Sequence, residues 1–162
     1  MSTKVDSALR TWMLSLGFVI LLPFSSCTQD EVGANDPKKR LTEYISRTFS
    51  IKTTDDRKDL ADFLSGEAKV RLSAWSDEQF RQAFIDSKRQ FIKLAFQEVK
   101  TQAPKEVDIT YELVFLDQGK DHDAKVTNKK LASLVQENGR WFISDVRNIK
   151  ELVEYRNEMS LP

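Results

Sequence analysis

A short apolar run near the N-terminus decides which part of this chain has to fold. The run spans the thirteen residues from Trp12 to Phe24, follows Lys4 and Arg10, and leads through two serines to Cys27, the only cysteine. A basic start, an apolar stretch and small residues before a cleavage point are typical of a secretory signal peptide. A transmembrane helix needs about twenty apolar residues, so this alternative fits less well. A buried helix with an ordinary thiol is also disfavoured, because the run lies at the extreme N-terminus behind a basic flank.

The end of the run, Leu21-Leu22-Pro23-Phe24-Ser25-Ser26-Cys27, resembles the lipobox of bacterial lipoproteins. In that family the cysteine is lipidated through its sulfur, the preceding peptide is removed and the new amino group is acylated. The resemblance therefore implies that residues 1–26 are a signal peptide and that Cys27 anchors the chain in a membrane. An aspartate after the cysteine retains enterobacterial lipoproteins in the inner membrane, and this chain has Thr28 there. The resemblance thus implies a location at the outer membrane, facing the periplasm.

The remaining 136 of the 162 residues are enough for one domain with a hydrophobic core. They carry 23 basic and 24 acidic side chains, a net charge of about −1, so nucleic acid is not an expected partner. With Cys27 lipidated, no thiol is left for a cysteine zinc site. The single histidine, His122, lies between two aspartates and is expected at a solvated hairpin tip rather than in a metal site. We expect no metal and no other cofactor.

Helices are predicted in the first half of the domain. Residues 27–36 are polar and are expected to form a tether, and the domain is expected to span residues 37–162. Asp36 followed by a proline is a helix start, and apolar side chains at three- and four-residue steps predict a helix over about 37–52. A second helix is expected to end at Ser65-Gly66, and residues 67–75 are expected to form a further helical turn. Residues 76–79 form a capping box that starts a third helix.

Strands are predicted in the second half. The segment from Gln90 to Lys100 fits a helix and a strand almost equally. We favour the strand, because a turn at 103–106 follows it and residues 107–115 then alternate cleanly between apolar and polar. Asn138-Gly139 is a strong two-residue hairpin signal, since both residues accept positive φ.

A two-residue turn at 138–139 would fix the register of the last hairpin, with the numbers of facing residues summing to 277. One face then carries Leu131, Val135, Phe142 and Val146, which we expect to pack against the helices. The other face carries Ala132, Leu134, Trp141, Ile143 and Asp145. Leu134, Trp141 and Ile143 on this second face are a candidate binding or homodimer surface. The alternative is that a short C-terminal helix starting near Asn148 covers them through Leu152 and Val153.

The order of elements, with the final Gly139-Arg140-Trp141-Phe142-Ile143-Ser144 after the turn, resembles the nuclear transport factor 2-like, cystatin-like fold. The expected fold class is therefore α+β. The resemblance implies N-terminal helices packed on a curved, cone-like, four-stranded antiparallel meander. Relatives use the cone either as an open pocket or, filled by side chains, as a scaffold.

Few residues suggest catalysis. Asp145 and Tyr111 are weak candidates because both are placed on strands, but we expect Asp145 to pair with Lys130 or Arg147 and Tyr111 to lie in the core. No residue is therefore assigned a catalytic role. We expect a membrane-anchored, extracytoplasmic lipoprotein that acts as a non-enzymatic binding or structural module for an unidentified protein or small ligand. The alternative is a small isomerase-like or hydratase-like enzyme that uses a carboxylate in a cone pocket.

Overall fold

The computed structural model describes residues 36–118 and 123–155. Helices precede a four-stranded antiparallel sheet with the strand order β1-β2-β3-β4, which confirms an α+β meander. The helical elements are α2 (Pro37–Thr48), η1 (Thr54–Asp56), α3 (Arg57–Ala61), α4 (Gly66–Ala74), α5 (Asp77–Phe80) and η2 (Arg81–Ile85). The strands are β1 (Arg89–Ala103), β2 (Glu106–Asp117), β3 (Ala124–Glu137) and β4 (Arg140–Tyr155).

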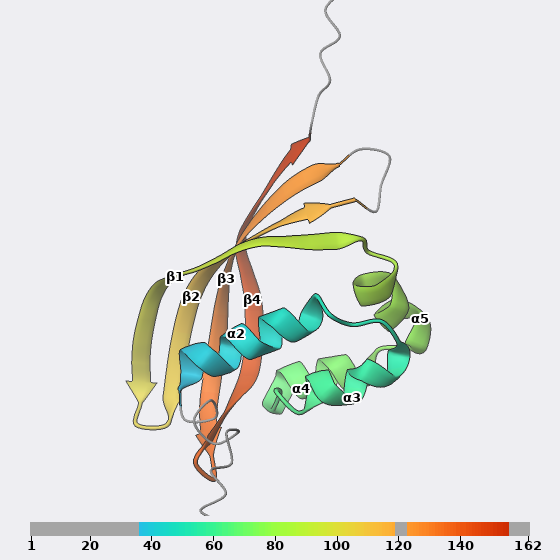
Figure 1. The fold of residues 1–162 in the computed structure, drawn as a ribbon. Coiled ribbons are helices and arrows are strands. Elements are labelled where there is room, and N and C mark those ends of the chain that lie inside the picture. Colours follow the sequence, from blue (N-terminus) through green and yellow to red (C-terminus); the bar gives the residue numbers. More distant parts are fainter. Residues whose placement is uncertain (1–35, 119–122, 156–162) are drawn as a thin grey trace, which may run out of the picture.

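The helices cover only part of the sheet. Figure 1 shows α2 lying across the lower halves of the strands, while the upper halves of β2, β3 and β4 extend past the helices. We call the face toward the helices the inner face. Its buried side chains, among them Leu41 and Ile45 of α2 and Ile109 of β2, form the core.

The predicted helix starts are confirmed, and the predicted ends are less accurate. The Asp36 carboxylate accepts a hydrogen bond of 2.9 Å from the Lys38 amide, and the Ser76 capping box forms as expected. The first helix ends at Thr48 rather than near residue 52. Gly66 does not end a helix: α3 stops at Ala61, and Gly66, with φ of +50°, begins α4.

Strand β1 confirms the favoured interpretation and explains why its periodicity was ambiguous. The register with β2 shifts at three places, because Ile92, Gln97 and Gln102 are extra residues without a partner. Such β-bulges interrupt the strict alternation of a strand. The inner-face residues of β1 are consequently Phe91, Leu94, Phe96 and Val99, whose uneven spacing imitates a helical pattern.

The expected C-terminal helix is wrong. Strand β4 continues to Tyr155, and its last residues pair with the start of β3. Two bulges, at Ser144 and Ile149, give β4 the same mixed spacing as β1. Leu152 and Val153 are 49% and 36% exposed, so they do not act as an internal lid.

The Asn138-Gly139 turn is confirmed, and the faces derived from it hold from the turn to Ile143 but not beyond it. Both residues have positive φ, and the expected register holds from Glu137–Arg140 to Leu134–Ile143. The bulge at Ser144 then shifts the pairing by one residue.

The helices pack on the opposite face from the one predicted. Leu134, Trp141 and Ile143 are at most 7% exposed and belong to the core, so they form neither a binding nor a dimer surface. Backbone hydrogen bonds of 3.0 Å and 2.9 Å between residues 63–65 and Ile143 also cover the edge of β4 there. The helix layer covers this face, whereas the opposite face carries ion pairs such as Lys93–Glu112.

Gly139→Ala should lower the free energy of unfolding by about 1 kcal/mol, since a side chain is strained in the left-handed region. The φ of Gly139 is +80°, and a Cβ there would meet no atom within 4 Å, so only backbone strain contributes. Gly139→Asn is the matched control and should cost clearly less, because asparagine tolerates this conformation. Urea unfolding measures both variants. An unchanged stability of Gly139→Ala would contradict the turn geometry.

Candidate functional site

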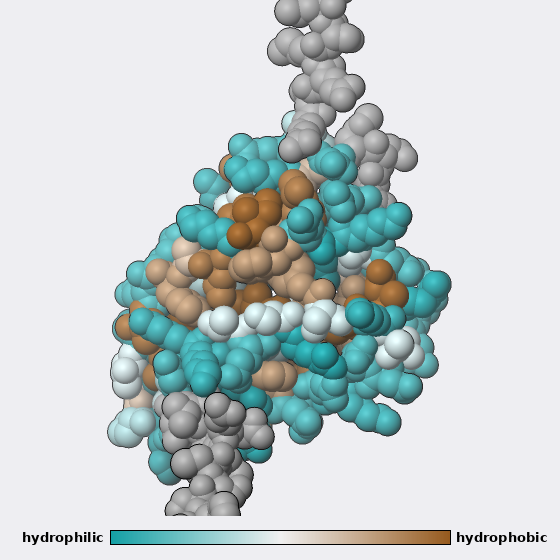
Figure 2. Space-filling model, in the orientation of Figure 1, coloured by the Kyte–Doolittle hydropathy of each residue, from teal (hydrophilic) through white to brown (hydrophobic). Residues whose placement is uncertain are grey.

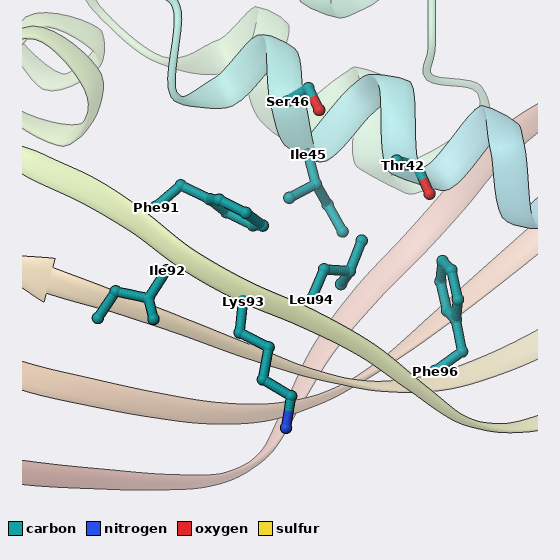
Figure 3. Close-up of a pocket in the computed structure, with 8 residues that line it drawn as sticks. All are labelled: Thr42, Ile45, Ser46, Phe91, Ile92, Lys93, Leu94 and Phe96. Carbon is teal, nitrogen blue, oxygen red and sulfur yellow. The ribbon is translucent and has the colours of Figure 1, made fainter.

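An open groove lies between α2 and the edge strand β1. Its volume is about 590 Å³. In Figure 3, Ile45 of α2 and Phe91, Leu94 and Phe96 of β1 point into the gap between the two elements. Figure 2 shows apolar residues gathered in this region, bordered by more polar ones. The groove therefore gives access to the inner face from the β1 side.

A second, smaller hollow lies at the uncovered end of the same face. Its volume is about 260 Å³, and it is lined by Phe115, Asp117, Ala124, Val126, Glu151, Val153 and Tyr155. These residues come from the end of β2, the start of β3 and the end of β4, where the strands extend past the helices in Figure 1. We call it the inner-face hollow. Phe115, Val126 and Val153 contribute apolar side chains to its lining, and Asp117 and Glu151 bring carboxylates to its wall.

Polar residues cross the inner face between the core and this hollow. We call Tyr111, Asn128, Lys130 and Glu151 the polar belt. The sheet register places Asn128 directly opposite Glu151 and Lys130 directly opposite Tyr111. Opposite residues in an antiparallel pair have Cα atoms roughly 5 Å apart, and Asn128 and Lys130 are roughly 6.6 Å apart along β3. Their side chains are therefore neighbours on one face.

Two polar groups of the belt, Asn128 and Lys130, are poorly satisfied within the protein, whereas the Glu151 side chain is exposed to solvent. Asn128 is only 5% exposed, yet its Oδ1 has no hydrogen-bond donor among the described residues. In the described part of the chain, neither Lys130 nor Glu151 forms an ion pair or a hydrogen bond with another side chain. Buried polar groups are nearly always paired, so an unpaired acceptor beside an unpaired lysine suggests a missing ligand.

Lys130 is electrostatically coupled to its surroundings. Burial lowers the pKa of the Lys130 ammonium, the Arg89 guanidinium lowers it further, and the Glu151 carboxylate raises it. Arg89 is held in place by hydrogen bonds of 2.8 Å to the Ala83 carbonyl and 3.0 Å to Ser87 Oγ. Arg89 therefore has a structural role, and Lys130 is the cation of the belt that is available to a ligand.

Tyr111 of the belt and the nearby Tyr44 both stay protonated. Burial raises the pKa of the Tyr44 hydroxyl, against the opposing effect of Arg71 and Arg89. Burial likewise raises the pKa of Tyr111, which is 2% exposed. Tyr111 lies in the core as predicted, and its neutral phenol is suited to hydrogen bonding rather than to acting as a base.

Asp145 lies away from the hollow and is engaged by cations. It forms ion pairs with Arg71 of α4 and, at 3.3 Å, with Arg147. The predicted pairing with Arg147 is confirmed, and the one with Lys130 is wrong. Sequence reasoning missed Arg71, because the contact joins residues that are distant in the sequence.

Sequence reasoning also missed the belt, although a signal was present. The inner-face positions of β3 alternate from Ala124 to Leu134, and Asn128 and Lys130 are the two polar residues in that series. A polar pair within the buried series of a strand indicates either a buried network or a binding site. The predicted positions Cys27 and His122 lie outside the described residues.

The described residues contain neither a metal-binding cluster nor a membrane-spanning helix. Within residues 36–118 and 123–155, no group of three or more histidine, cysteine, aspartate or glutamate side chains is placed to hold a metal ion. No helix in the described part of the chain is long and apolar enough to cross a membrane.

Comparisons with known proteins identify a fold neighbour and no family. No family model and no curated protein matches the chain. The solution structure of RPA3114, a SEC-C motif containing protein from Rhodopseudomonas palustris, is similar with a TM-score of 0.52 and 13% identity. The match covers 73% of this chain and 82% of that protein. At this identity the likeness concerns the fold alone.

Asn128→Leu should raise the free energy of unfolding by about 1–2 kcal/mol, because leucine of similar size removes an unsatisfied buried polar group. Gln90→Leu is the control, since Gln90 is exposed on the other face of the sheet, opposite Leu116, and its replacement should change stability by less than about 0.5 kcal/mol. Urea unfolding of the ligand-free protein measures both. A loss of stability in Asn128→Leu would mean that Asn128 has an internal partner.

Proposed function

We propose that this chain is a lipid-anchored lipoprotein of the bacterial cell envelope that binds a small ligand on the inner face of its sheet. The single observation that supports binding is the buried Asn128 Oδ1 without a donor, two residues along β3 from Val126 of the inner-face hollow and two from the unpaired Lys130. A fold does not retain such groups for stability, since each unsatisfied buried group costs about 1–3 kcal/mol. A ligand that completes their hydrogen bonds recovers this cost.

The proposed anchor is Cys27, by its resemblance to the lipobox cysteine. Cys27 precedes Asp36, the N-cap of α2, by nine residues. A fully extended chain of that length reaches roughly 30 Å, so the domain would stay close to the bilayer. With Thr28 after the cysteine, we place the protein at the outer membrane, facing the periplasm.

We also propose that the sheet is a cone of the nuclear transport factor 2-like type. Support comes from the bulged edge strands β1 and β4 and from α2 lying across the inner face. Bulges bend a strand and increase its twist, which is how a meander becomes concave. In this cone the helices fill one end and leave the inner-face hollow at the other.

Binding is favoured over the isomerase-like or hydratase-like alternative. That alternative rests on Asp145 as the carboxylate base of a pocket. Asp145 is engaged by Arg71 and Arg147 and is not among the residues of either hollow. Its negative charge is therefore used to hold α4 against β4.

Cys27→Ser should move the protein from the membrane fraction to the soluble fraction. The reason is that each buried methylene of a lipid chain contributes about 0.8 kcal/mol to membrane binding. Ser26→Ala is the matched control, because it keeps a small residue before the cysteine and should leave the protein membrane-bound. Immunoblots of washed membranes measure both. Retention of Cys27→Ser in the membrane would refute the lipid anchor.

A small-molecule extract of the cell envelope should raise the melting temperature of the wild-type protein but not that of Asn128→Leu. A ligand at one hundred times its Kd stabilises the folded state by about 2.7 kcal/mol. Gln90→Leu should respond like the wild type, because that residue is exposed on the other face of the sheet. An identical response of wild type and Asn128→Leu would contradict binding at this face.

A further inference from the structure

The second half of β4 has an uncovered edge. β4 is the last strand in the order β1-β2-β3-β4, so one side of its backbone has no strand neighbour. Near Ile143 this side is covered by backbone hydrogen bonds with residues 63–65. From Arg147 to Tyr155 no described residue forms such a bond with it, and every residue of this stretch is exposed. We call this stretch the free edge of β4.

The free edge lacks the features that usually prevent a strand from pairing with another chain. β-Bulges interrupt such an edge, and those at Ile92, Gln97 and Gln102 leave β1 at most four regular residues in succession. In β4 the six residues from Lys150 to Tyr155 pair with β3 without a shift. Apolar side chains, among them Tyr155 at 65% exposure, lie along the same stretch. The free edge of β4 is therefore the better template for a further strand.

A second copy of the chain can pair with this edge in few registers. The outward N–H and C=O groups belong to every second residue, so residues that face each other must differ by an even number. A two-fold axis then passes through one residue that faces its own counterpart. An axis through Lys150, Glu151 or Glu154 sets identical charges against each other. An axis through Val153 sets Leu152 against the Glu154 carboxylate.

The register centred on Leu152 is the complementary one. Leu152 meets its counterpart, and Lys150 meets Glu154 of the partner subunit. These residues share the outer face of the sheet, because they pair with Thr127, Lys129 and Lys125 of β3. Two-fold symmetry forms the Lys150–Glu154 contact twice. Apolar pairs and opposite charges that face each other across antiparallel strands are stabilising.

Lys150 also lacks an anion within its own chain. The register places it opposite Lys129, and like charges in this position are destabilising. In the described part of the chain Lys150 forms no ion pair. Glu154 contacts Lys125 at 3.1 Å, but both side chains are half exposed and a carboxylate accepts from more than one donor. Glu154 of the partner subunit can therefore supply the missing anion.

The helices leave room for this pairing. Figure 1 shows the end of β4 extending past the helix layer. Ile143, where residues 63–65 cover the edge, precedes Leu152 by nine residues, which is roughly 30 Å along the strand. Because the paired strands run in opposite directions, the covered segments of the two copies lie on opposite sides of the axis.

We propose that two copies of this chain form a two-fold symmetric dimer by antiparallel pairing of their free β4 edges, centred on Leu152. The two four-stranded sheets become one continuous sheet. Val153 of the partner subunit then faces Glu151, which lines the inner-face hollow, so the second copy contributes to the wall of that site. The dimer requires neither the proposed lipid anchor nor the proposed ligand.

Cysteine cross-linking in cells that express the full chain tests the register. Leu152→Cys should give a disulfide-linked dimer, because facing Cα atoms are roughly 5 Å apart and a disulfide spans about 4.4–6.8 Å. Lys150→Cys and Glu154→Cys are the matched controls. Both residues are equally exposed on the same face, but each is offset from its counterpart by roughly 13 Å along the strands.

Each control alone should give no more dimer than the wild type, which measures any contribution of Cys27. The double variant Lys150→Cys/Glu154→Cys should be cross-linked, because these two positions face each other across the axis. Non-reducing electrophoresis and immunoblots measure all variants.

A charge exchange tests the contact between Lys150 and Glu154. In the Leu152→Cys protein, Lys150→Glu sets carboxylates against each other twice and should slow cross-linking about tenfold. Adding Glu154→Lys restores opposite charges and should restore the rate. Lys105→Glu is the control for net charge, since Lys105 is exposed in the turn between β1 and β2, and it should leave the rate unchanged.

The outcomes decide the proposal. Absence of the Leu152→Cys dimer, or equal cross-linking of Leu152→Cys and the two single controls, overturns the dimer. Cross-linking that is insensitive to Lys150→Glu overturns the register. All substituted residues are exposed, so every variant should keep the wild-type melting temperature, which shows that a lost cross-link is not a lost fold.

Discussion

The rest of this structure depends on one difference between its strands. The central strands β2 and β3 pair regularly, whereas the edge strands β1 and β4 contain β-bulges. Strands β2 and β3 pair without a shift from Glu106–Val135 to Asp117–Ala124. The edge strands β1 and β4 each contain extra residues relative to their neighbours, which lengthens both edges. A sheet with longer edges than centre has to curve, because bulges bend and twist their strand. This curvature creates the inner face on which the helices pack and on which the polar belt lies.

Arg40 fixes the helix layer to this curved sheet. Its side chain is 7% exposed and donates hydrogen bonds to the backbone carbonyls of Trp141 and Asp62, at 3.2 Å and 2.6 Å. The guanidinium also lies over the Phe63 ring, 4.0 Å from its centroid. Burial lowers the pKa of Arg40, but its charge is retained because carbonyl oxygens and an aromatic face stabilise a cation. The Arg40 side chain of α2 thus links two other parts of the chain, the segment that follows α3 and strand β4.

The sequence predicted the local features of this fold and failed where distant segments decide. Helix N-caps and the hairpin turn were predictable, since Asp36, Ser76 and Asn138-Gly139 act through their own side chains or backbone. The strand conformation at the end of β4 was not predictable, because the bulges at Ser144 and Ile149 give its apolar residues the spacing of a helix. The choice of the inner face failed for the same reason: both faces carry apolar residues, and only the packed helices decide which face is buried.

The candidate site illustrates the same limit. Asn128 and Lys130 stand out in the series of β3 only after the strand is known to be buried on that face, and Glu151 joins them only through the corrected register. With β4 as a helix, Glu151 would be an ordinary surface residue. The bulge at Ile149 is therefore what brings a carboxylate opposite Asn128. Because the same irregularity curves the sheet and completes the belt, the shape of the hollow and its chemistry have a common structural origin.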